Sequence, residues 1–308
     1  MTPSHAHGSG RRVLVTGGSG LIGAAVVGHL AALGHHVTVL DITGARVPEG
    51  AASFTPGTVT DAETVRRAVA GQDAVVHLAG RAGLDRGTPE EIYAANALGT
   101  FIVMDAAGQA GVAKVVYASS INAFGLPLNP HDVLPSRYPW DEDEPAAIAD
   151  AYSLSKQANE NAATALASQH GTELTGLRFP LVRDIYEDEG TVFARHIRGG
   201  IEEDPRRQAC EGWTYLDVRD AAGAVQAALS HPTPAAPGIL VAAPQTYLRQ
   251  PTEDALERYA PTVPRDPVAG RDVPVSLRRS HELLGFKAEH TLEQLSEDLL
   301  VDLDEVNP

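Results

Sequence analysis

Close to its start, the chain carries a short apolar run that leads directly into closely spaced glycines. The run is Arg12–Thr16, which is rich in β-branched residues, and the next seven residues include Gly17, Gly20 and Gly23. An Ala, Val and Leu pattern with helical spacing then covers residues 21–33. We therefore predict a strand, a tight glycine turn and a helix, in that order. This order restricts the fold more than any other feature of the chain.

The same alternation of strand and helix continues to about residue 180. Further strands are predicted at residues 36–40, 74–78, 112–118 and 174–179, with a weak strand or bend at 54–59. Helices are predicted at residues 61–70, 88–109 and 151–169, the second of them capped by Thr88 with Pro89 at its first position. Strands and helices in this order predict an α/β fold with a Rossmann-like, doubly wound parallel sheet.

The glycine turn has the spacing of a dinucleotide-binding motif. Gly18, Gly20 and Gly23 fit G-x-G-x-x-G between a strand and a helix, where the backbone can approach a pyrophosphate. Asp41 ends the second predicted strand, and a carboxylate there can bind both hydroxyls of an adenosine ribose. The same charge repels a 2′-phosphate, so we expect NAD as the cofactor. Arg46 lies close enough in sequence to leave NADP as the alternative.

A second motif lies at the start of the helix predicted at residues 151–169. Tyr152 and Lys156 are four residues apart, so on a helix they share one face and can point into one cleft. A nearby positive charge favours the phenolate and lowers the pKa of a tyrosine. The pair is therefore suited to moving a proton on or off a hydroxyl group.

Composition restricts the class of protein. The net charge of −16 argues against nucleic acid or an anionic membrane as a partner, and no apolar run approaches the length of a membrane span. Cys210 is the only cysteine, which excludes an internal disulfide and favours a reducing, cytoplasmic location. Residues 1–10 are predicted to be a disordered tail. His5 and His7 within it are expected to be inert, and we expect no metal site.

The pattern becomes less regular after residue 125. Residues 126–150 are rich in proline and acidic residues around Trp140, and we expect this long loop to close over a ligand as a lid. Final helices are predicted at residues 276–284 and 292–303. We expect a nucleotide-binding domain at residues 11–178, to which residues 213–245 return. Residues 179–212 and 246–308 would form a smaller substrate-binding lobe.

With these motifs in order, the chain resembles an extended short-chain dehydrogenase/reductase of the NAD-dependent epimerase/dehydratase family. The resemblance runs from Arg12 onward. Its motifs are T-G-G-x-G-x-x-G at residues 16–23, H-L-A-G at 77–80, N-x-x-G-T at 96–100, the serine segment at 117–125, and the Tyr152 and Lys156 pair. The segments at 217–220 and 281–286 resemble C-terminal landmarks of the family.

The resemblance implies a role for each matched residue. Tyr152 would be the acid/base, Lys156 would lower its pKa and bind the nicotinamide ribose, and Ser120 would hydrogen-bond the substrate oxygen. Asp61 would contact adenine and Pro180 would lie beside the nicotinamide. The residues implied to bind NAD are Gly17, Gly20, Leu21, Ile22, Gly23, Asp41, Asp61, Leu78, Ala79, Gly80, Asn96, Tyr152, Lys156 and Pro180. Homodimerisation through the helices near residues 90–109 and 151–169 is also implied.

The substrate is less well defined. Relatives that act on nucleotide-diphosphate sugars usually carry an asparagine in the segment that is 177–182 here, and an arginine where Trp213 stands; this chain has neither. The segment around Trp213 is instead similar to that of uronate dehydrogenases. Asn122 and Arg183 are candidate substrate-binding residues. Arginines are frequent in this lobe, at positions 183, 195, 198, 206 and 207, and one or two of them can receive a carboxylate or phosphate.

These observations predict an NAD-dependent oxidoreductase that acts on a secondary alcohol or lactol of a sugar, sugar acid or polyol. Two alternatives stay open. One is a sugar or nucleotide-sugar epimerase or dehydratase, which uses the same Ser120, Tyr152 and Lys156. The other is a non-catalytic regulator that senses NAD, which the presence of the Tyr152 and Lys156 pair makes less favoured.

Overall fold

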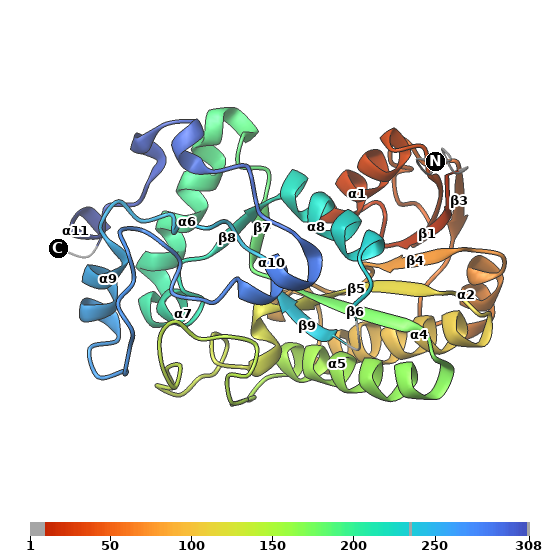
Figure 1. Ribbon diagram of the computed structural model, residues 1–308, viewed down its shortest axis with the longest axis horizontal. Coiled ribbons are helices and arrows are strands. Elements are labelled where there is room, and N and C mark those ends of the chain that lie inside the picture. The colour runs from red at the N-terminus through yellow and green to blue at the C-terminus, as the bar shows by residue number, and fades with distance from the viewer. Residues whose placement is uncertain (1–9, 234–235, 307–308) are drawn as a thin grey trace, which may run out of the picture.

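The computed structural model describes residues 10–233 and 236–306. The predicted tail, which includes His5 and His7, lies outside the described residues except for Gly10, its last residue. Two lobes lie side by side along the long axis, and the larger lobe contains the N-terminal half of the chain (Figure 1).

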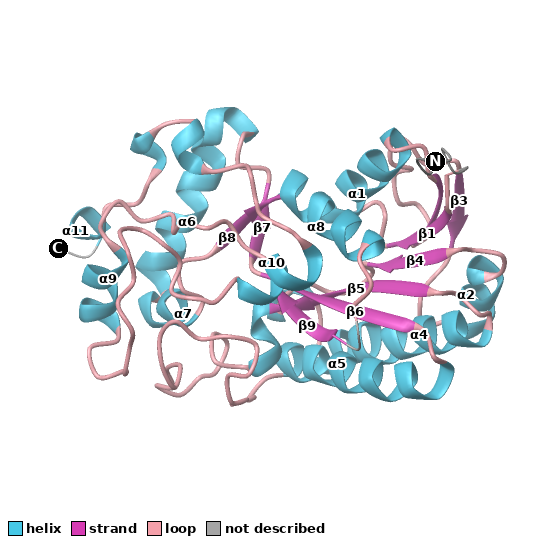
Figure 2. Ribbon diagram, in the orientation of Figure 1, coloured by secondary structure: helices cyan, strands magenta, loops and turns pink. Residues whose placement is uncertain are grey.

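A seven-stranded parallel sheet forms the centre of the larger lobe (Figure 2). Its strand order is β3-β2-β1-β4-β5-β6-β9, and every neighbouring pair is parallel. The strands are β1 (Arg12–Thr16), β2 (His36–Asp41), β3 (Ser53–Pro56), β4 (Ala74–His77), β5 (Lys114–Ser120), β6 (Glu173–Phe179) and β9 (Ala236–Leu240). The predicted doubly wound parallel sheet is confirmed.

Alternating side chains of each strand enter two separate cores. Val13 and Val15 of β1 pack in the core that lies under helices α1 and α8, whereas Leu14 enters the core on the opposite face. Both faces are apolar because a parallel sheet is covered by helices on both sides. This explains why the strands appear in the sequence as continuous apolar runs rather than as alternating patterns.

Five main helices cover the two faces. Helix α1 packs against α8 on one face, and α2, α4 and α5 pack side by side on the other. Their bounds are α1 (Leu21–Ala32), α2 (Ala62–Val69), α4 (Gly99–Gln109), α5 (Ala151–His170) and α8 (Val218–Ser230). A short 3-10 turn, η1 (Leu84–Arg86), lies between β4 and the helices that follow it.

The helix predicted at residues 88–109 is helical throughout but not uniform. It begins as predicted at Thr88, whose side chain forms a capping box with Glu91 over α3 (Pro89–Tyr93). A π-helical segment, η2 (Ala94–Leu98), then separates α3 from α4. Such wide turns often occur at functional sites, and this one contains Asn96. Spacing alone did not reveal it, because a π segment adds no distinctive residue type.

The smaller lobe has its own core. It contains a two-stranded parallel sheet of β7 (Leu181–Arg183) and β8 (Tyr215–Asp217), with α6 (Thr191–Glu203), α7 (Pro205–Cys210) and α9 (Thr252–Tyr259) around it. The largest buried side chains of this core include Trp140, Tyr138, Trp213 and Tyr247. Two further short turns are η3 (Ile121–Phe124) and η4 (Glu187–Gly190).

The loop at residues 126–150 is part of this core, which corrects the expectation of a lid. Trp140 is buried, and its backbone bonds to the backbone of Pro274 and Ser276. Tyr138 is paired in the same way with Pro264 and Asp266, and its hydroxyl donates to a carbonyl of α7 at 2.9 Å. These partners are about 70 or more residues away in the chain, so the sequence pattern could not predict them.

The C-terminal segment also differs from prediction. Helix α10 (Arg278–Leu284) lies within the predicted range 276–284, but no continuous helix covers 292–303. That stretch forms two 3-10 turns, η5 (Leu292–Gln294) and η6 (Glu297–Leu299), because Ser296 caps the second turn and interrupts the helix. The described chain ends in the short α11 (Leu303–Val306).

The chain passes between the lobes more than once. After the smaller lobe it returns to the large sheet through α8 and β9. Trp213 and Tyr215, however, pack in the smaller core, and Leu284 and Phe286 pack beneath α8 in the larger lobe. The exact domain boundaries remain a prediction.

Candidate active site

The glycine turn lies at the carboxyl edge of the sheet, between β1 and α1. Gly17 has a φ of 70°, and a Cβ there would lie 2.5 Å from the backbone nitrogen of Ala79. A Cβ at Gly23 would lie 2.1 Å from the Gly17 carbonyl oxygen. By contrast, a Cβ at Gly20 would meet that same oxygen at 3.4 Å and, apart from its chain neighbours, nothing else in the described part of the chain within 4 Å. A side chain at Gly20 would therefore fill free space at the N-terminus of α1, beside the backbone of Leu21 and Ile22.

Asp41 is fixed next to this turn. One carboxylate oxygen accepts a hydrogen bond from the backbone N–H of Ser19 at 2.8 Å, and the other from that of Ile42 at 2.8 Å. The hydroxyl of Ser19 is buried without a partner among the described residues. A fixed carboxylate here can accept hydrogen bonds from ribose hydroxyls, and its charge opposes a phosphate at the same place.

Asp61 has a structural partner that the sequence analysis did not expect. Its two carboxylate oxygens accept from the backbone N–H groups of Glu63 and Thr64 and from the Thr64 hydroxyl, so it caps α2. These bonds lower the pKa of Asp61, the hydroxyl of Thr64 most of all. The adenine contact stays a prediction, because an exposed carboxylate still has acceptor capacity.

The segment after β4 closes the other side of the turn. The backbone of Leu78 bonds to Thr16, and Ala79 lies against Gly17. Asn96 then holds the next residues: its amide oxygen accepts from the N–H of Arg81 at 2.7 Å, and its amide nitrogen donates to the Arg81 carbonyl at 3.0 Å. A Cβ at Gly80 would lie 2.8 Å from that amide oxygen. The geometry gives Asn96 the role of fixing this loop.

Ser120 is the last residue of β5, opposite the last residue of β6 in the sheet register. Its side chain is 5% exposed, and its hydroxyl oxygen accepts from the backbone N–H of Asn122 at 3.1 Å and from the Asn122 amide at 3.4 Å. The amide oxygen of Asn122 is buried and has no hydrogen-bond partner among the described residues. Because buried polar atoms are rarely left without partners, this oxygen is suited to accept from a bound hydroxyl group.

Tyr152 and Lys156 lie in the first two turns of α5, where the sequence places them on one face. The helix begins after Asp150, which caps it through the N–H of Ser153 at 2.7 Å. The Lys156 nitrogen lies 5.6 Å from the centroid of the Tyr152 ring and donates to the backbone carbonyl of Ala118 at 2.9 Å. Both side chains are 8% exposed. The ammonium is thus held between the phenol and the strand that ends in Ser120.

Burial changes the acidity of both groups. Burial lowers the pKa of Lys156 to about 8, against an opposing effect of the Glu160 carboxylate. Burial also raises the pKa of Tyr152, and a hydrogen bond from Ser120 and the charge of Arg207 oppose that rise. The protein alone therefore does not give Tyr152 the low pKa that the sequence analysis expects. Desolvation outweighs the nearby positive charges.

The face that carries Tyr152 and Lys156 continues to Glu160, which sequence analysis missed. Glu160 accepts two bonds from the guanidinium of Arg178, at 2.9 and 2.8 Å, and one from the hydroxyl of Ser119 at 2.6 Å. This buried pair fixes α5 against β5 and β6. The repeated spacing of four residues, from 152 to 156 to 160, was the available signal.

His77 is a second group that the residue pattern did not explain. Its ring nitrogens lie 2.7 Å from the Thr16 hydroxyl and 2.9 Å from the Thr100 hydroxyl, deep below the glycine turn. Burial, together with the charge of Lys156, lowers the pKa of His77 to about 3. The neutral ring therefore joins β1, β4 and α4 beneath the site.

Pro180 follows β6 directly, and the chain then enters β7, which ends at Arg183. Since Ser120 pairs with Phe179, Pro180 lies at the same edge of the sheet as Ser120. Arg183 is half-buried, and its guanidinium donates to the carbonyl of Val182 at 2.8 Å.

Most of the other candidate arginines of the smaller lobe already bond to groups of the protein itself. Arg206 donates to four backbone carbonyls of the loop at 126–133, which fixes that loop. Arg198 lies 3.5 Å from Glu305, and Arg207 bonds to Glu211 at 2.9 Å. Trp213 is fully buried in the smaller core and so does not line the surface of the site.

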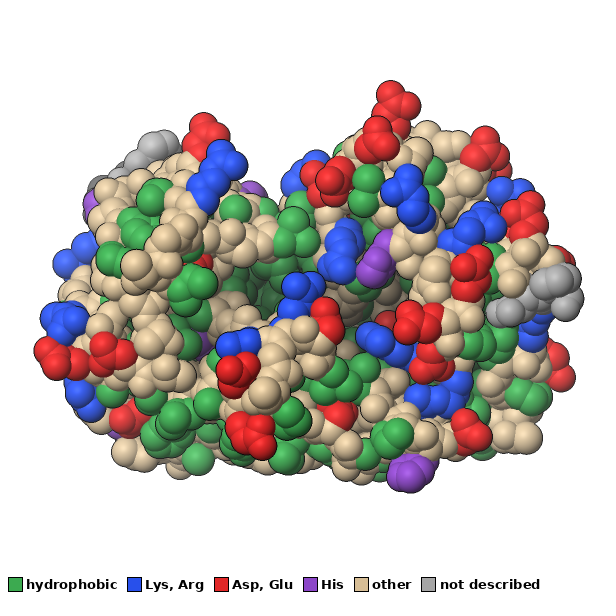
Figure 3. Space-filling model, turned by 180° about the vertical axis from the view of Figure 1, so that it is seen from behind, with side chains coloured by type: hydrophobic (Ala, Val, Ile, Leu, Met, Phe, Trp, Pro, Cys, Tyr) green, Lys and Arg blue, Asp and Glu red, His purple; other side chains and the backbone are tan. Residues whose placement is uncertain are grey.

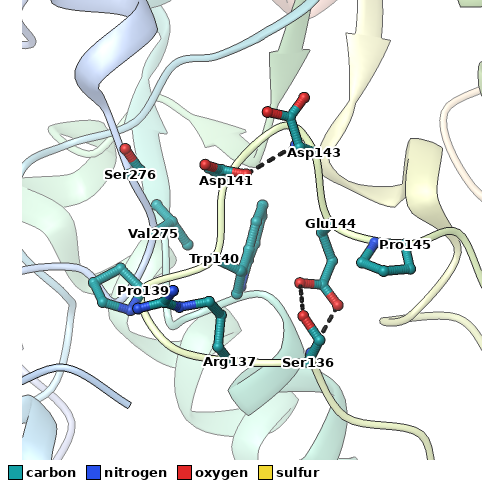
Figure 4. A pocket seen from close by; sticks show the side chains of 10 residues that line it. All are labelled: Ser136, Arg137, Pro139, Trp140, Asp141, Asp143, Glu144, Pro145, Val275 and Ser276. Carbon is teal, nitrogen blue, oxygen red and sulfur yellow. Dashed lines mark hydrogen bonds between the residues drawn. The ribbon is translucent and has the colours of Figure 1, made fainter. Parts of the chain in front are cut away.

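A hollow separates the two lobes on the face seen in Figure 3, and Lys and Arg side chains gather along it. A cavity of about 440 Å³ lies elsewhere, and Figure 4 shows the residues that line it: Ser136, Arg137, Pro139, Trp140, Asp141, Asp143, Glu144, Pro145, Val275 and Ser276. None of Ser120, Tyr152 and Lys156 lines it. A second space of about 550 Å³ lies beside Ser19 and Arg46, next to the glycine turn.

The parallel sheet, the glycine turn and the Ser120, Tyr152 and Lys156 group together define a dinucleotide-binding enzyme of the short-chain dehydrogenase/reductase type. Residues 13–243 match the NAD dependent epimerase/dehydratase family, so the chain belongs to that family. That family is described as NAD dependent, and a solved structure similar to this chain contains bound NAD. The residues fit this cofactor, because the free space at Gly20 lies at the N-terminus of a helix, where the pyrophosphate would bind.

Curated relatives match the chain over about half of its length. A UDP-glucose 4-epimerase of Streptomyces lividans is 33% identical over 169 residues, which are 52% of this chain and 49% of the relative. A dTDP-glucose 4,6-dehydratase of Streptomyces niveus is 32% identical over 184 residues, 54% of this chain and 52% of the relative. The chain therefore spans about half the length of these relatives.

Solved structures match nearly the whole chain. A short-chain dehydrogenase/reductase superfamily protein of Agrobacterium tumefaciens with bound NAD has a TM-score of 0.69 and 26% identity, covering 94% of this chain and 96% of that one. A mutated uronate dehydrogenase has a TM-score of 0.64 and 22% identity, covering 94% and 85%. The second likeness shows the fold alone.

Proposed function

We propose that this protein is an NAD-dependent oxidoreductase that acts on a secondary alcohol or lactol carbon of a sugar, sugar acid or related polyol. The observation that supports this best is the convergence of Ser120 from β5 with Tyr152 and Lys156 from α5 at the carboxyl edge of the sheet. A substrate hydroxyl placed there would meet a hydrogen-bond donor and an acid/base group together.

In this proposal each side chain has one task. Bound NAD supplies the hydride acceptor. Tyr152 takes the proton of the substrate hydroxyl as the carbon below it loses hydride, and the product is a carbonyl compound. Ser120 donates to the substrate oxygen and fixes its distance from Tyr152. Lys156, held by the Ala118 carbonyl, supports the phenolate, and Asn122 offers its amide oxygen to a neighbouring hydroxyl.

The second candidate is a sugar or nucleotide-sugar epimerase or dehydratase. The names of the curated relatives favour it, and the same three residues would carry it, with the hydride returned to the sugar in the same cycle. The absence of an asparagine at residues 177–182 supports a substrate without a nucleotide. A non-catalytic NAD sensor is the third candidate, and the positioned Tyr152 and Lys156 pair argues against it.

One experiment separates these candidates. Purified protein is incubated with NAD or NADP and with free sugars, uronic acids, polyols and UDP-glucose, while NADH absorbance and product isomers are followed. Net NADH formation with a free sugar or uronate supports the leading proposal, and NAD is expected to exceed NADP because of Asp41. Isomers without net NADH would transfer the assignment to the epimerase. If no substrate of the panel gives either NADH or a product isomer, the non-catalytic NAD sensor becomes the better account.

A homodimer is part of the same proposal. Four apolar side chains are 40–50% exposed on the helices of one face, at Tyr93, Leu98, Phe101 and Leu154. They belong to α3, η2, α4 and α5, which pack against one another. A second copy of this chain is the proposed partner.

Among the described residues no helix could cross a membrane. Cys210, the single cysteine of the sequence, is free and buried, which supports the proposed cytoplasmic location.

A further inference from the structure

A buried network of hydrogen bonds crosses the larger lobe from the glycine turn to helix α5. Its side chains belong to Thr16, His77, Thr100 and Asn159, and each of these residues is at most 2% exposed. The His77 ring lies 2.7 Å from the Thr16 hydroxyl through Nδ1 and 2.9 Å from the Thr100 hydroxyl through Nε2. Asn159 lies in α5, less than one turn beyond Lys156, and it was not among the candidate residues in the sequence.

The neighbours of Asn159 assign the orientation of its amide. With the amide nitrogen donating to the backbone carbonyls of Asn96 and Ser155, at 3.1 Å each, the amide oxygen accepts from the Thr100 hydroxyl at 3.2 Å. In the opposite orientation the amide oxygen would face two carbonyl oxygens, neither of which can donate. The Thr100 hydroxyl therefore donates its single hydrogen to Asn159.

This direction determines which nitrogen of His77 carries the hydrogen. Since the Thr100 hydroxyl already donates to Asn159, its oxygen can only accept from His77, which places the hydrogen on Nε2. The buried ring is neutral and has a single N–H, so Nδ1 accepts from the hydroxyl of Thr16. The oxygen of Thr16 accepts from the backbone N–H of Ala79 at 3.4 Å, in the segment that closes the glycine turn.

At its other end the buried network reaches the first turns of α5. The amide nitrogen of Asn96 donates to the hydroxyl of Ser155 at 3.1 Å, and that hydroxyl donates to the carbonyl of Tyr152 at 2.6 Å. Asn159 binds the carbonyls of the same two residues, Asn96 and Ser155. The π-helical segment η2 is therefore attached to the turns of α5 that carry Tyr152 and Lys156.

We propose that Thr100 and Asn159 are positioning residues, which hold His77 in its Nε2–H tautomer and thereby keep the glycine turn and the helix of Tyr152 in a fixed relation. A buried polar network is rigid when each member has its partner, and a small misplacement of a reacting group lowers the rate strongly. The effect on the rate rests on the proposed function, whereas the tautomer of His77 does not depend on it.

The first test is the tautomer of His77 in the purified protein, read from ¹H–¹⁵N correlation spectra of the histidine rings. The His77 signals are those that disappear in His77→Asn, and we expect the hydrogen on Nε2. Thr100→Val removes the acceptor with little change of shape and should move the hydrogen to Nδ1, which then donates to Thr16. Asn159→Ala frees the Thr100 hydroxyl to donate to Nε2 and should act in the same direction. Thr100→Ser keeps the hydroxyl and should keep the Nε2–H form.

The second test compares kinetics with the first panel compound that the unaltered protein converts. Thr100→Val and Asn159→Ala should each lower kcat about 10- to 100-fold and change KM little, because both residues are buried away from the substrate. Thr100→Ser should retain kcat. Thr172→Val is the matched control, because it removes another buried hydroxyl of the larger lobe, which donates to the carbonyl of Val112 at 3.1 Å. It should lower stability without changing kcat or the tautomer of His77.

Three outcomes would overturn the inference. The first is a hydrogen on Nδ1 of His77 in the unaltered protein, and the second is an Nε2–H form that both Thr100→Val and Asn159→Ala retain. The third is that both variants lose stability, as Thr172→Val does, but keep the kcat of the unaltered protein. If no panel compound is converted, the proposed reaction fails, and the tautomers of the unaltered protein and its variants alone decide the inference.

Discussion

Burial sets the charge state of the side chains beneath the glycine turn. His77 is enclosed between two threonine hydroxyls and stays neutral down to a pKa of about 3. Lys156, only partly compensated by Glu160, has its pKa lowered to about 8. The charge of Lys156 acts on His77, so a neutral His77 avoids a second positive charge beside Lys156. The sequence shows these residue types but not their desolvation.

His77 leads to a prediction about stability and pH. Its folded pKa is below its unfolded value of 6.5, so between pH 6.5 and 3 the unfolded chain binds more protons than the folded chain. Its contribution to stability is complete above pH 6.5 and falls as the pH decreases. Between pH 7 and pH 5 this group alone should remove about 2 kcal/mol from the free energy of unfolding.

Urea unfolding at the two pH values checks this. His77→Asn should lose less stability over that interval than the unaltered protein, even if its stability at pH 7 is lower. His36→Asn, at an exposed position, should lose as much stability between pH 7 and pH 5 as the unaltered protein. An equal pH response in His77→Asn and the unaltered protein would contradict the buried neutral ring.

At the scale of elements, α5 carries the catalytic face and the anchor of that face together. Tyr152, Lys156 and Glu160 follow one another at intervals of four residues, and Glu160 is fixed to β6 through Arg178. The guanidinium also donates to the carbonyl of Glu142 at 3.1 Å, in the loop of the smaller lobe. One buried pair therefore joins the helix, the sheet and the loop.

Glu160→Gln should destabilise the protein strongly. The change leaves the buried guanidinium of Arg178 without its counter-charge, which typically costs about 3–5 kcal/mol. Glu63→Gln is the matched control, since Glu63 forms an exposed pair with Arg67 and should cost about 1 kcal/mol or less. Chemical denaturation measures both. Similar free energies of unfolding for the two variants would show that the buried pair does not anchor α5.

The elements also show what a sequence can and cannot predict. The strand at Val13 to Val15 and the turn at Gly17 are determined by residues that are close together in the sequence. The prediction therefore placed both of them well. The contacts of Trp140 with Pro274, and of Arg206 with the carbonyls at 126–133, join segments far apart in the chain. For the site, the spacing of Tyr152 and Lys156 was enough to propose a pair. The buried pair of Glu160 and Arg178 required the fold.

In the whole molecule, the two lobes carry different parts of the proposed site. The larger lobe carries the glycine turn and the acid/base pair, and the smaller lobe contributes Arg183 and the fixed loop at 126–150. The exposed apolar side chains lie on the larger lobe, on the helices that cover one face of the sheet. A contact between two copies there would leave the hollow between the lobes accessible.

Phe101→Glu should therefore shift the protein from dimer to monomer, because a charge would be buried in the contact. Sedimentation velocity measures the mass, and Leu33→Glu, at an exposed apolar position at the end of α1, is the control. A monomer already in the unaltered protein, or a dimer that Phe101→Glu does not weaken, would exclude this face as the contact.

The account depends most on proton transfer by Tyr152, and single-substrate kinetics of Tyr152→Phe tests it directly. The substrate is the first panel compound converted by the unaltered protein, and Tyr93→Phe on α3 removes the same atom from an exposed position. We predict that Tyr152→Phe lowers kcat about 10²- to 10⁴-fold with NADH affinity retained, while Tyr93→Phe acts like the unaltered protein. A kcat for Tyr152→Phe close to that of the unaltered protein would contradict the account.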